Sequence, residues 1–238
     1  MPAGERALPI ARTARGGFVR AVAAIVWKDL AAELRSKELI SGMLVFALLV
    51  VLVFNFALEL DVRARQSVTA GVLWVTFAFA GTLGLNRSLA LERDGGCLEG
   101  LLLAPVDRSA IYFGKALGNL VFMAIMEILV LPVYSALYNV NLFQPLLLLV
   151  VALGSVGYVA LGTLLSAMAV QARTRDVLLP ILLFPVVLPV IISAVKASTG
   201  VLQGVPMEEI WPWLNLLIAC DVIFVAAGYM VFDFVVEE

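Results

Sequence analysis

Six long apolar stretches, separated by short gaps, set the strongest limit on how this chain can fold. A helix needs about 20 mostly apolar residues to cross the roughly 30 Å of hydrocarbon in a bilayer. The stretches that meet this requirement are 39–58, 68–91, 112–138, 142–170, 177–197 and 214–236. They are apolar on every side and do not alternate with the period of two that barrel strands need. The sequence therefore predicts an all-α integral membrane protein with six transmembrane helices.

Composition agrees with this class and excludes soluble catalytic domains. The chain is 63% hydrophobic and 14% charged, whereas a soluble domain averages about half apolar and a quarter charged residues. The gaps between the apolar stretches are too short to fold into a separate domain. We therefore expect a membrane subunit that is not itself an enzyme.

The distribution of Lys and Arg predicts how the chain is oriented. If the amino terminus is cytosolic, all but three of the 16 Lys and Arg fall in cytosolic segments, the exceptions being Arg63, Arg65 and Lys196. Cytosolic loops of membrane proteins carry this excess of positive charge. The expectation is a multi-pass protein of the bacterial cytoplasmic (inner) membrane with both termini in the cytosol. The net charge of −2 gives no reason to expect a nucleic-acid partner.

The segment before the first stretch has its own pattern. Residues 1–17 contain Pro and Gly and predict a flexible tail, and residues 39–238 form the six-span domain. Between them, residues 18–38 place Val, Leu and Trp at helical spacing, with Arg and Lys on the other side, which predicts an amphipathic helix in the membrane interface. Two roles remain open for this helix, a simple anchor or a docking element; its acidic residues Asp29 and Glu33 slightly favour docking.

A short charged segment, residues 92–111, lies between the second and third stretches, and we name it the coupling hinge. Leu98, Leu101 and Leu102 recur at helical spacing and predict an apolar ridge for a soluble partner. Pro105 would end this short helix, and Asp107 or Ser109 could cap the next. The alternative is that the charges only keep a cytosolic turn soluble. The residues that we expect to couple to a partner are Glu92, Arg93, Asp94, Gly96, Leu98, Glu99, Leu101, Leu102 and Pro105.

One ionisable residue lies in the middle of an apolar stretch. Glu127 stands in the sequence FMAIMEILVLP, where an ionised group costs about 3 kcal/mol or more unless it is partnered. We expect it to face the bundle, to be protonated or to meet a polar neighbour. A structural contact and a role in the transport route are both open. Asp221, in the last stretch, invites the same argument more weakly.

The hinge also carries a family resemblance. The sequence LERDGGCLEGLLLAPVDRSAIYFGK around it, and LLPILLFPVVLPVII in the fifth stretch, resemble the CcmB family of haem exporter subunits of cytochrome c maturation. The resemblance implies an ABC-2-like exporter permease, present in two copies, with a CcmA-type ATPase as its partner. It also implies CcmC-type and CcmD-type membrane subunits, and it connects the complex indirectly to the haem chaperone CcmE.

Missing residues support that division of labour. The chain has no His, the commonest protein ligand of haem iron, and it has no GxxxxGK[ST] phosphate loop. We therefore expect this chain to bind no cofactor or metal. ATP would be hydrolysed by the partner ATPase, and haem would be handled by the partner subunits.

Two other functions remain open on the sequence alone. The same hinge would suit an ABC-2 permease for another amphiphile, such as a lipid, a polysaccharide or a drug. An ion-coupled secondary transporter would use Glu127 as its ion or proton site. The sequence offers no symmetry-related second acid of the kind that inverted repeats place at such a site.

Overall fold

The computed structural model describes residues 14–57, 62–94, 106–169 and 174–237. These residues form seven α-helices and no strand. The helices are α1 (Ala14–Ser36), α2 (Glu38–Ala57), α3 (Val62–Asp94), α5 (Arg108–Tyr138), α6 (Pro145–Ala169), α7 (Arg175–Gln203) and α8 (Met207–Glu237).

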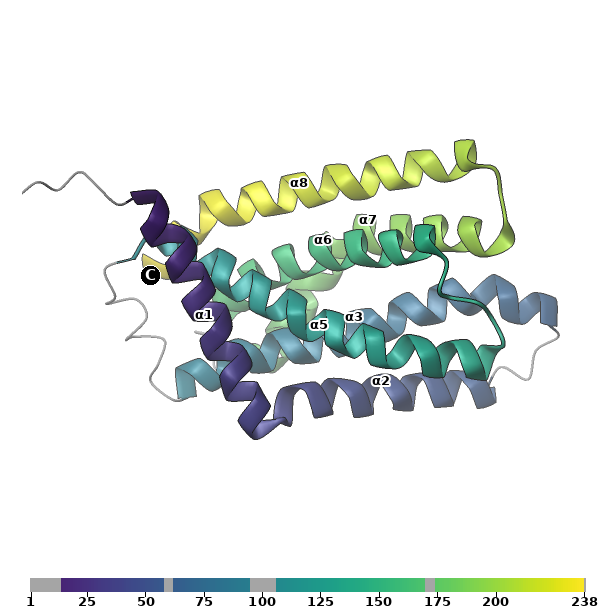
Figure 1. Ribbon diagram of the computed structural model, residues 1–238, viewed down its shortest axis with the longest axis horizontal. Helices are drawn as coiled ribbons and strands as arrows, with labels where there is room; N and C mark the ends of the chain where they lie inside the picture. The colour runs from purple at the N-terminus through teal and green to yellow at the C-terminus, as the bar shows by residue number, and fades with distance from the viewer. Residues whose placement is uncertain (1–13, 58–61, 95–105, 170–173, 238) are drawn as a thin grey trace, which may run out of the picture.

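The six helices after α1 lie side by side in a bundle, each antiparallel to the one before it in the chain, and α1 crosses one end of the bundle (Figure 1). We call this end, on the left in Figure 1, the α1 end. The last residues of α3, the first residues of α5 and the last residues of α8 all lie there. The last residues of α2, α5 and α7 lie at the opposite end.

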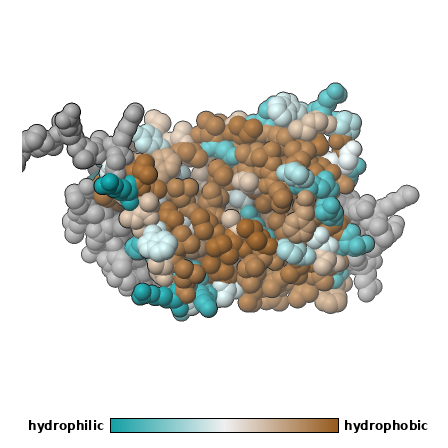
Figure 2. All heavy atoms as spheres, viewed as in Figure 1, coloured by the Kyte–Doolittle hydropathy of each residue, from teal (hydrophilic) through white to brown (hydrophobic). Residues whose placement is uncertain are grey.

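Six of the helices are long and apolar enough to cross a membrane. Helices α3 and α6 are the most buried, whereas α2, α7 and α8 expose large apolar side chains such as Phe56 and Val222. Figure 2 shows apolar side chains covering the middle of the visible face, with polar ones gathered toward its two ends. Such an apolar surface suits a bilayer rather than water. The six long apolar helices confirm the six-span all-α fold predicted from the sequence.

Close approach of helices depends on small residues at several positions. Trp74 of α3 packs over Gly154 of α6, and Met43 of α2 packs over Gly84 of α3. A Cβ at either glycine would overlap the facing side chain. The Trp74 indole Nε1 also donates a hydrogen bond to Ser198 Oγ of α7 at 3.0 Å. Small residues and buried polar contacts are how membrane helices associate, since lipid provides little hydrophobic drive between them.

A single residue separates α1 from the first span. Lys37 adopts a left-handed backbone conformation with φ 55°. The carboxylate of the buried Glu33 accepts a hydrogen bond from the Ile40 backbone N–H at 2.8 Å. Glu33 therefore caps the start of α2 from within α1, since the first N–H groups of a helix have no partner of their own.

Helix α1 begins at Ala14, inside the segment that the sequence predicts as a tail. Gly16 and Gly17 are helical despite a cost of about 1 kcal/mol each relative to Ala. Phe18, one residue later, packs edge-on against Phe113 of α5, with ring centroids 6.1 Å apart. The contact between Phe18 and Phe113 thus lies at the start of α1, where the two glycines disfavour a helix.

Candidate functional site

The parts of the coupling hinge that the structure describes, at the end of α3 and the start of α5, lie at the α1 end of the bundle (Figure 1). Glu92, Arg93 and Asp94 are the last three residues of α3, which therefore runs into the segment predicted as hinge. The other predicted coupling residues, Gly96, Leu98, Glu99, Leu101, Leu102 and Pro105, lie outside the described residues. The predicted helical ridge of Leu98, Leu101 and Leu102 therefore stays a prediction.

The start of α5 differs from the sequence prediction in one detail. Asp107 occupies the N-cap position, but its side chain makes no capping hydrogen bond. The Asp107 carbonyl instead accepts the Ala110 N–H at 2.9 Å, so the backbone itself closes the first turn. Arg108 Nη1 donates to the Asp233 carbonyl of α8 at 3.4 Å, which connects the start of α5 to the end of α8.

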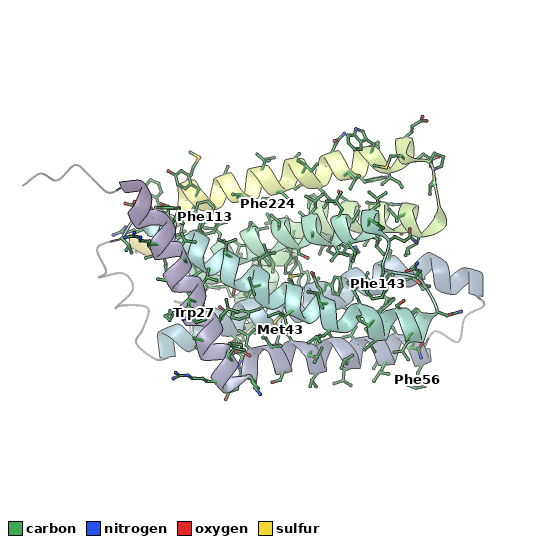
Figure 3. All side chains as sticks on the ribbon, viewed as in Figure 1. Trp27, Met43, Phe56, Phe113, Phe143 and Phe224 are labelled. Atoms are coloured by element: carbon green, nitrogen blue, oxygen red, sulfur yellow. The ribbon has the colours of Figure 1, made fainter. Side chains whose placement is uncertain are left out.

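Helix α1 is attached to α5 by a buried ion pair. Lys115 Nζ donates to Asp29 Oδ2 at 2.7 Å, and the Lys115 side chain is only 2% exposed. Lys28 approaches the other carboxylate oxygen of Asp29 at 3.3 Å. Figure 3 shows α1 crossing this region, with Trp27 on α1 and Phe113 on α5 labelled.

This arrangement overturns one argument drawn from the sequence. Asp29 and Glu33 of α1 slightly favoured docking to another protein, but Asp29 pairs with α5 and Glu33 caps α2. Both acids are therefore used inside the chain. The exposed side of α1 carries Val19, Trp27 and Leu34 instead, which suits a helix lying in the membrane interface.

Two further polar contacts join helices at the α1 end. The Glu38 carboxylate of α2 forms an ion pair with Arg87 of α3. Asn86 of α3 donates a hydrogen bond from Nδ2 to Asp176 Oδ1 of α7 at 2.8 Å. Asp29–Lys115 and Arg108–Asp233 join α1, α5 and α8, while Glu38–Arg87 and Asn86–Asp176 join α2, α3 and α7. Of the described helices, α6 alone takes no part in these four contacts.

Helix α6 joins this end of the bundle through Tyr112. The Tyr112 hydroxyl donates to the Ala160 carbonyl of α6 at 3.0 Å. Its ring packs against Phe232 of α8, with centroids 5.5 Å apart, and over Gly228. Ile25 of α1 belongs to the same buried apolar cluster. A displacement of the first turns of α5 would therefore be felt by α1, α6 and α8.

Two buried carboxylates lie deeper in the bundle, on either side of α6. Glu127 of α5 is 5% exposed and accepts a hydrogen bond from Ser155 Oγ at 2.5 Å. Asp221 of α8 is 7% exposed and lies against Gly157 of α6, and no hydrogen-bond donor of the described chain reaches its carboxylate oxygens. Glu127 thus faces the bundle and meets a polar neighbour, which is one of the outcomes its position favoured.

These acids do not form a metal site with their surroundings. Across the described ranges, no group of three or more His, Cys, Asp or Glu side chains converges in a way that could hold a metal ion. The cysteine within these ranges, Cys220, is buried and free.

Sequence reasoning assigned several of these residues no specific contact. Lys115 and Arg87 counted only among the positive charges of the cytosolic segments, and no partner was predicted for Asn86. The available signal was a Lys in an otherwise apolar helix start, flanked by Gly114 and Gly118, together with an Asp on the preceding amphipathic helix. That signal indicates a buried pair without naming the partner of either charge.

Comparison with known proteins gives a consistent family. The CcmB protein family matches residues 20–235. The chain is 27% identical over 186 residues to heme exporter protein B of Pseudomonas aeruginosa, covering 78% of this chain and 83% of the relative. It is 27% identical over 186 residues to heme exporter protein B of Rhodobacter capsulatus, covering 78% and 85%. The protein of the same name from Bradyrhizobium diazoefficiens is 25% identical over 210 residues, covering 87% and 93%. Since the family match takes in all six spans and most of α1, this chain belongs to the CcmB protein family.

Proposed function

We propose that this chain is the membrane permease subunit of an ABC-type haem exporter that serves cytochrome c maturation. The observation that carries the proposal is the family match over residues 20–235, which includes the coupling hinge and the six-helix bundle. Relatives named heme exporter protein B supply the substrate class. The work done by the complex is export of haem itself or release of a haem-loaded CcmE-type chaperone from a CcmC-type subunit.

The proposed mechanism divides the labour between subunits. A CcmA-type ATPase binds and hydrolyses ATP and docks at the coupling hinge. The α1 end faces the cytosol in this proposal, as the distribution of Lys and Arg favours. Two copies of this chain face two ATPase subunits, and CcmC-type and CcmD-type subunits complete the complex. Haem is handled by those subunits, because this chain has no His to serve as an axial ligand.

In this mechanism the chain transmits the force of the ATPase from the hinge to the membrane helices. Polar contacts join the helices around the hinge at the α1 end. A push on the hinge by the ATPase would therefore be distributed to several spans at once. Such coupling requires two arrangements of the bundle whose balance the nucleotide state shifts.

The test is charge reversal in the hinge of the assembled complex. Glu92→Lys with Glu99→Lys should release the ATPase subunit or uncouple its activity, while the membrane domain stays folded. The matched control is Glu208→Lys with Glu209→Lys, which reverses two exposed acids at the opposite end of the bundle. The measurement is the ATPase subunit recovered with the tagged chain and the yield of mature c-type cytochrome.

Different outcomes separate the candidate functions. A hinge variant that retains both the ATPase and full maturation would refute docking at this segment. Recovery of an ATPase without any CcmC-type haem protein would favour an ABC-2 permease for another amphiphile. Recovery of neither would favour an ion-coupled transporter, with Glu127 as its first candidate site.

A further inference from the structure

The contact between α1 and α5 is more deeply buried than an ion pair at a helix surface. The Lys115 side chain is 2% exposed and that of Asp29 is 10% exposed, with Nζ and Oδ2 2.7 Å apart. Buried charges are expensive to desolvate. Removing one partner of such a pair leaves the other charge uncompensated and strongly destabilises the folded protein. Lys28, by contrast, is 42% exposed and meets Asp29 from the outer side. Lys28 belongs to α1 itself, so of the two ion pairs of Asp29 the one with Lys115 is the pair that joins α1 to α5.

Backbone shape reinforces the pair. Gly114 and Gly118 are spaced one helical turn apart on α5, and Ile25 and Asp29 have the same spacing on α1. A Cβ at position 114 would lie 2.8 Å from Ile25 Cβ, and one at position 118 would lie 3.8 Å from Asp29 Cβ. Side chains of α1 thus sit directly over glycines of α5. This interlocked packing opposes sliding of one helix along the other.

The location of the pair gives it a consequence. Lys115 lies about two helical turns after Arg108, the first residue of α5. The hinge, residues 92–111, ends within the first turn of that helix. We propose that Asp29 and Lys115 are positioning residues that clamp α1 to α5, so that a force on the hinge moves both helices as one body. This inference rests on the proposed function, because it assigns a route for the force that the partner ATPase delivers.

The clamp also extends the reach of the hinge. Helix α1 is joined to α2 through the Glu33 cap, and α2 to α3 through Glu38 and Arg87. Movement of α5 would therefore also reach the first span, α2, by way of α1, without direct contact between α2 and the ATPase. Loss of the clamp should leave the ATPase docked but poorly coupled.

The first experiment breaks the pair in the reconstituted complex with its ATPase. Lys115→Met should lower ATP hydrolysis per bound ATPase subunit about tenfold, within the roughly 5–150-fold range of ordinary coupling effects. The amount of ATPase bound should stay unchanged. Lys28→Gln is the matched control, because it removes the exposed partner of Asp29 within α1 and leaves the pair between the two helices in place; hydrolysis should stay close to that of the wild type. If Lys115→Met does not accumulate in the membrane, Asp29→Asn tests the same pair, because it removes the charge but keeps an oxygen for Lys115.

The second experiment replaces the ion pair with a covalent bond. The 3.8 Å expected between the two Cβ atoms matches the mean for a disulfide, so Asp29→Cys with Gly118→Cys should cross-link α1 to α5. Lys115→Met is included to avoid an unpaired buried charge, in a Cys97→Ser and Cys220→Ala background. The reduced protein should be poorly coupled, and oxidation should restore hydrolysis to within about twofold of the background protein. Gly118→Cys alone, treated in the same way, controls for oxidation.

The outcomes separate this inference from the proposed function. Full coupling in Lys115→Met, or a cross-link that forms without restoring hydrolysis, would overturn the clamp and leave the proposed function standing. Failure of the wild-type chain to recover any ATPase would refute the proposed function itself. Restoration by the cross-link would support the clamp, because a purely electrostatic role for Lys115 could not be replaced by a disulfide.

Discussion

Gly154→Ala should destabilise the bundle by much more than its single added methyl group suggests. A Cβ at position 154 would lie 2.8 Å from Trp74 Cζ3 and 3.0 Å from Cζ2, and would overlap Cη2. The indole cannot move aside freely, because it is 2% exposed and donates a hydrogen bond to Ser198 at 3.0 Å. The helices α3 and α6, which form the buried centre of the bundle, must therefore separate or the ring must turn.

The expected cost follows from two terms. Overpacking of a well-filled core costs about 1–3 kcal/mol. A broken side-chain hydrogen bond between membrane helices adds about 0.6 kcal/mol, and up to about 1.7 kcal/mol. We therefore expect the free energy of unfolding to fall by about 2–4 kcal/mol. Gly71→Ala is the matched control on α3, because a Cβ there meets nothing within 4 Å and Ala is favoured over Gly in a helix by about 1 kcal/mol.

The assay is unfolding of the purified chain in mixed micelles with increasing denaturing detergent, followed by loss of helical circular dichroism. The transition of Gly154→Ala should shift to lower detergent, whereas that of Gly71→Ala should stay in place or shift to higher detergent. Adding Trp74→Phe to Gly154→Ala should recover part of the loss, since a smaller ring leaves room for the Cβ. Equal stability of the two Gly→Ala variants would refute the packing argument.

Three further predictions concern polar contacts. Glu127→Gln should change assembly and activity little, because a neutral amide can still accept a hydrogen bond from Ser155; lost activity at normal expression would show that the charge is used. Glu33→Ala should lower the free energy of unfolding by about 1 kcal/mol through loss of a helix cap, and Glu33→Gln, which keeps the accepting oxygen, should cost less, so equal losses would argue against capping. A double-mutant cycle of Arg87→Gln and Glu38→Gln should give a coupling energy below about 1 kcal/mol that shrinks with added salt. The reason is that these side chains are 42% and 57% exposed. A larger, salt-independent coupling energy would contradict a surface ion pair.

The spans were predictable because length and hydropathy alone decide which segments can cross a bilayer. The six candidate spans of the structure overlap the six predicted stretches one for one. Helix ends were less predictable: α3 runs on to Asp94, and α5 begins four residues before the predicted start at Tyr112. A helix can continue through charged residues beyond the hydrocarbon, and hydropathy alone does not mark where such an extension begins or ends.

The partners of the polar residues were not predictable from one chain. Lys115 and Asp29 are 86 positions apart, and nothing in either local sequence names the other. The same holds for Asn86 with Asp176, whose contact depends on α3 and α7 being neighbours in the bundle. Hydropathy shows which segments are buried but gives no helix order, so pairs between helices need the tertiary structure. The role of the hinge residues remains a prediction from sequence.

The one-residue joint at Lys37 makes α1 a lever. Helix α1 has 23 residues, and at 1.5 Å per residue its far end lies about 34 Å from the joint. No loop lies between α1 and α2 to absorb motion, so a tilt of α2 would also tilt α1. A change of about 10° at Lys37 would displace the first turn of α1 by about 6 Å, close to the rise of one helical turn. Since α1 is held to α5 by the Asp29–Lys115 pair and by Phe18 against Phe113, such a displacement would have to carry the first turns of α5 with it.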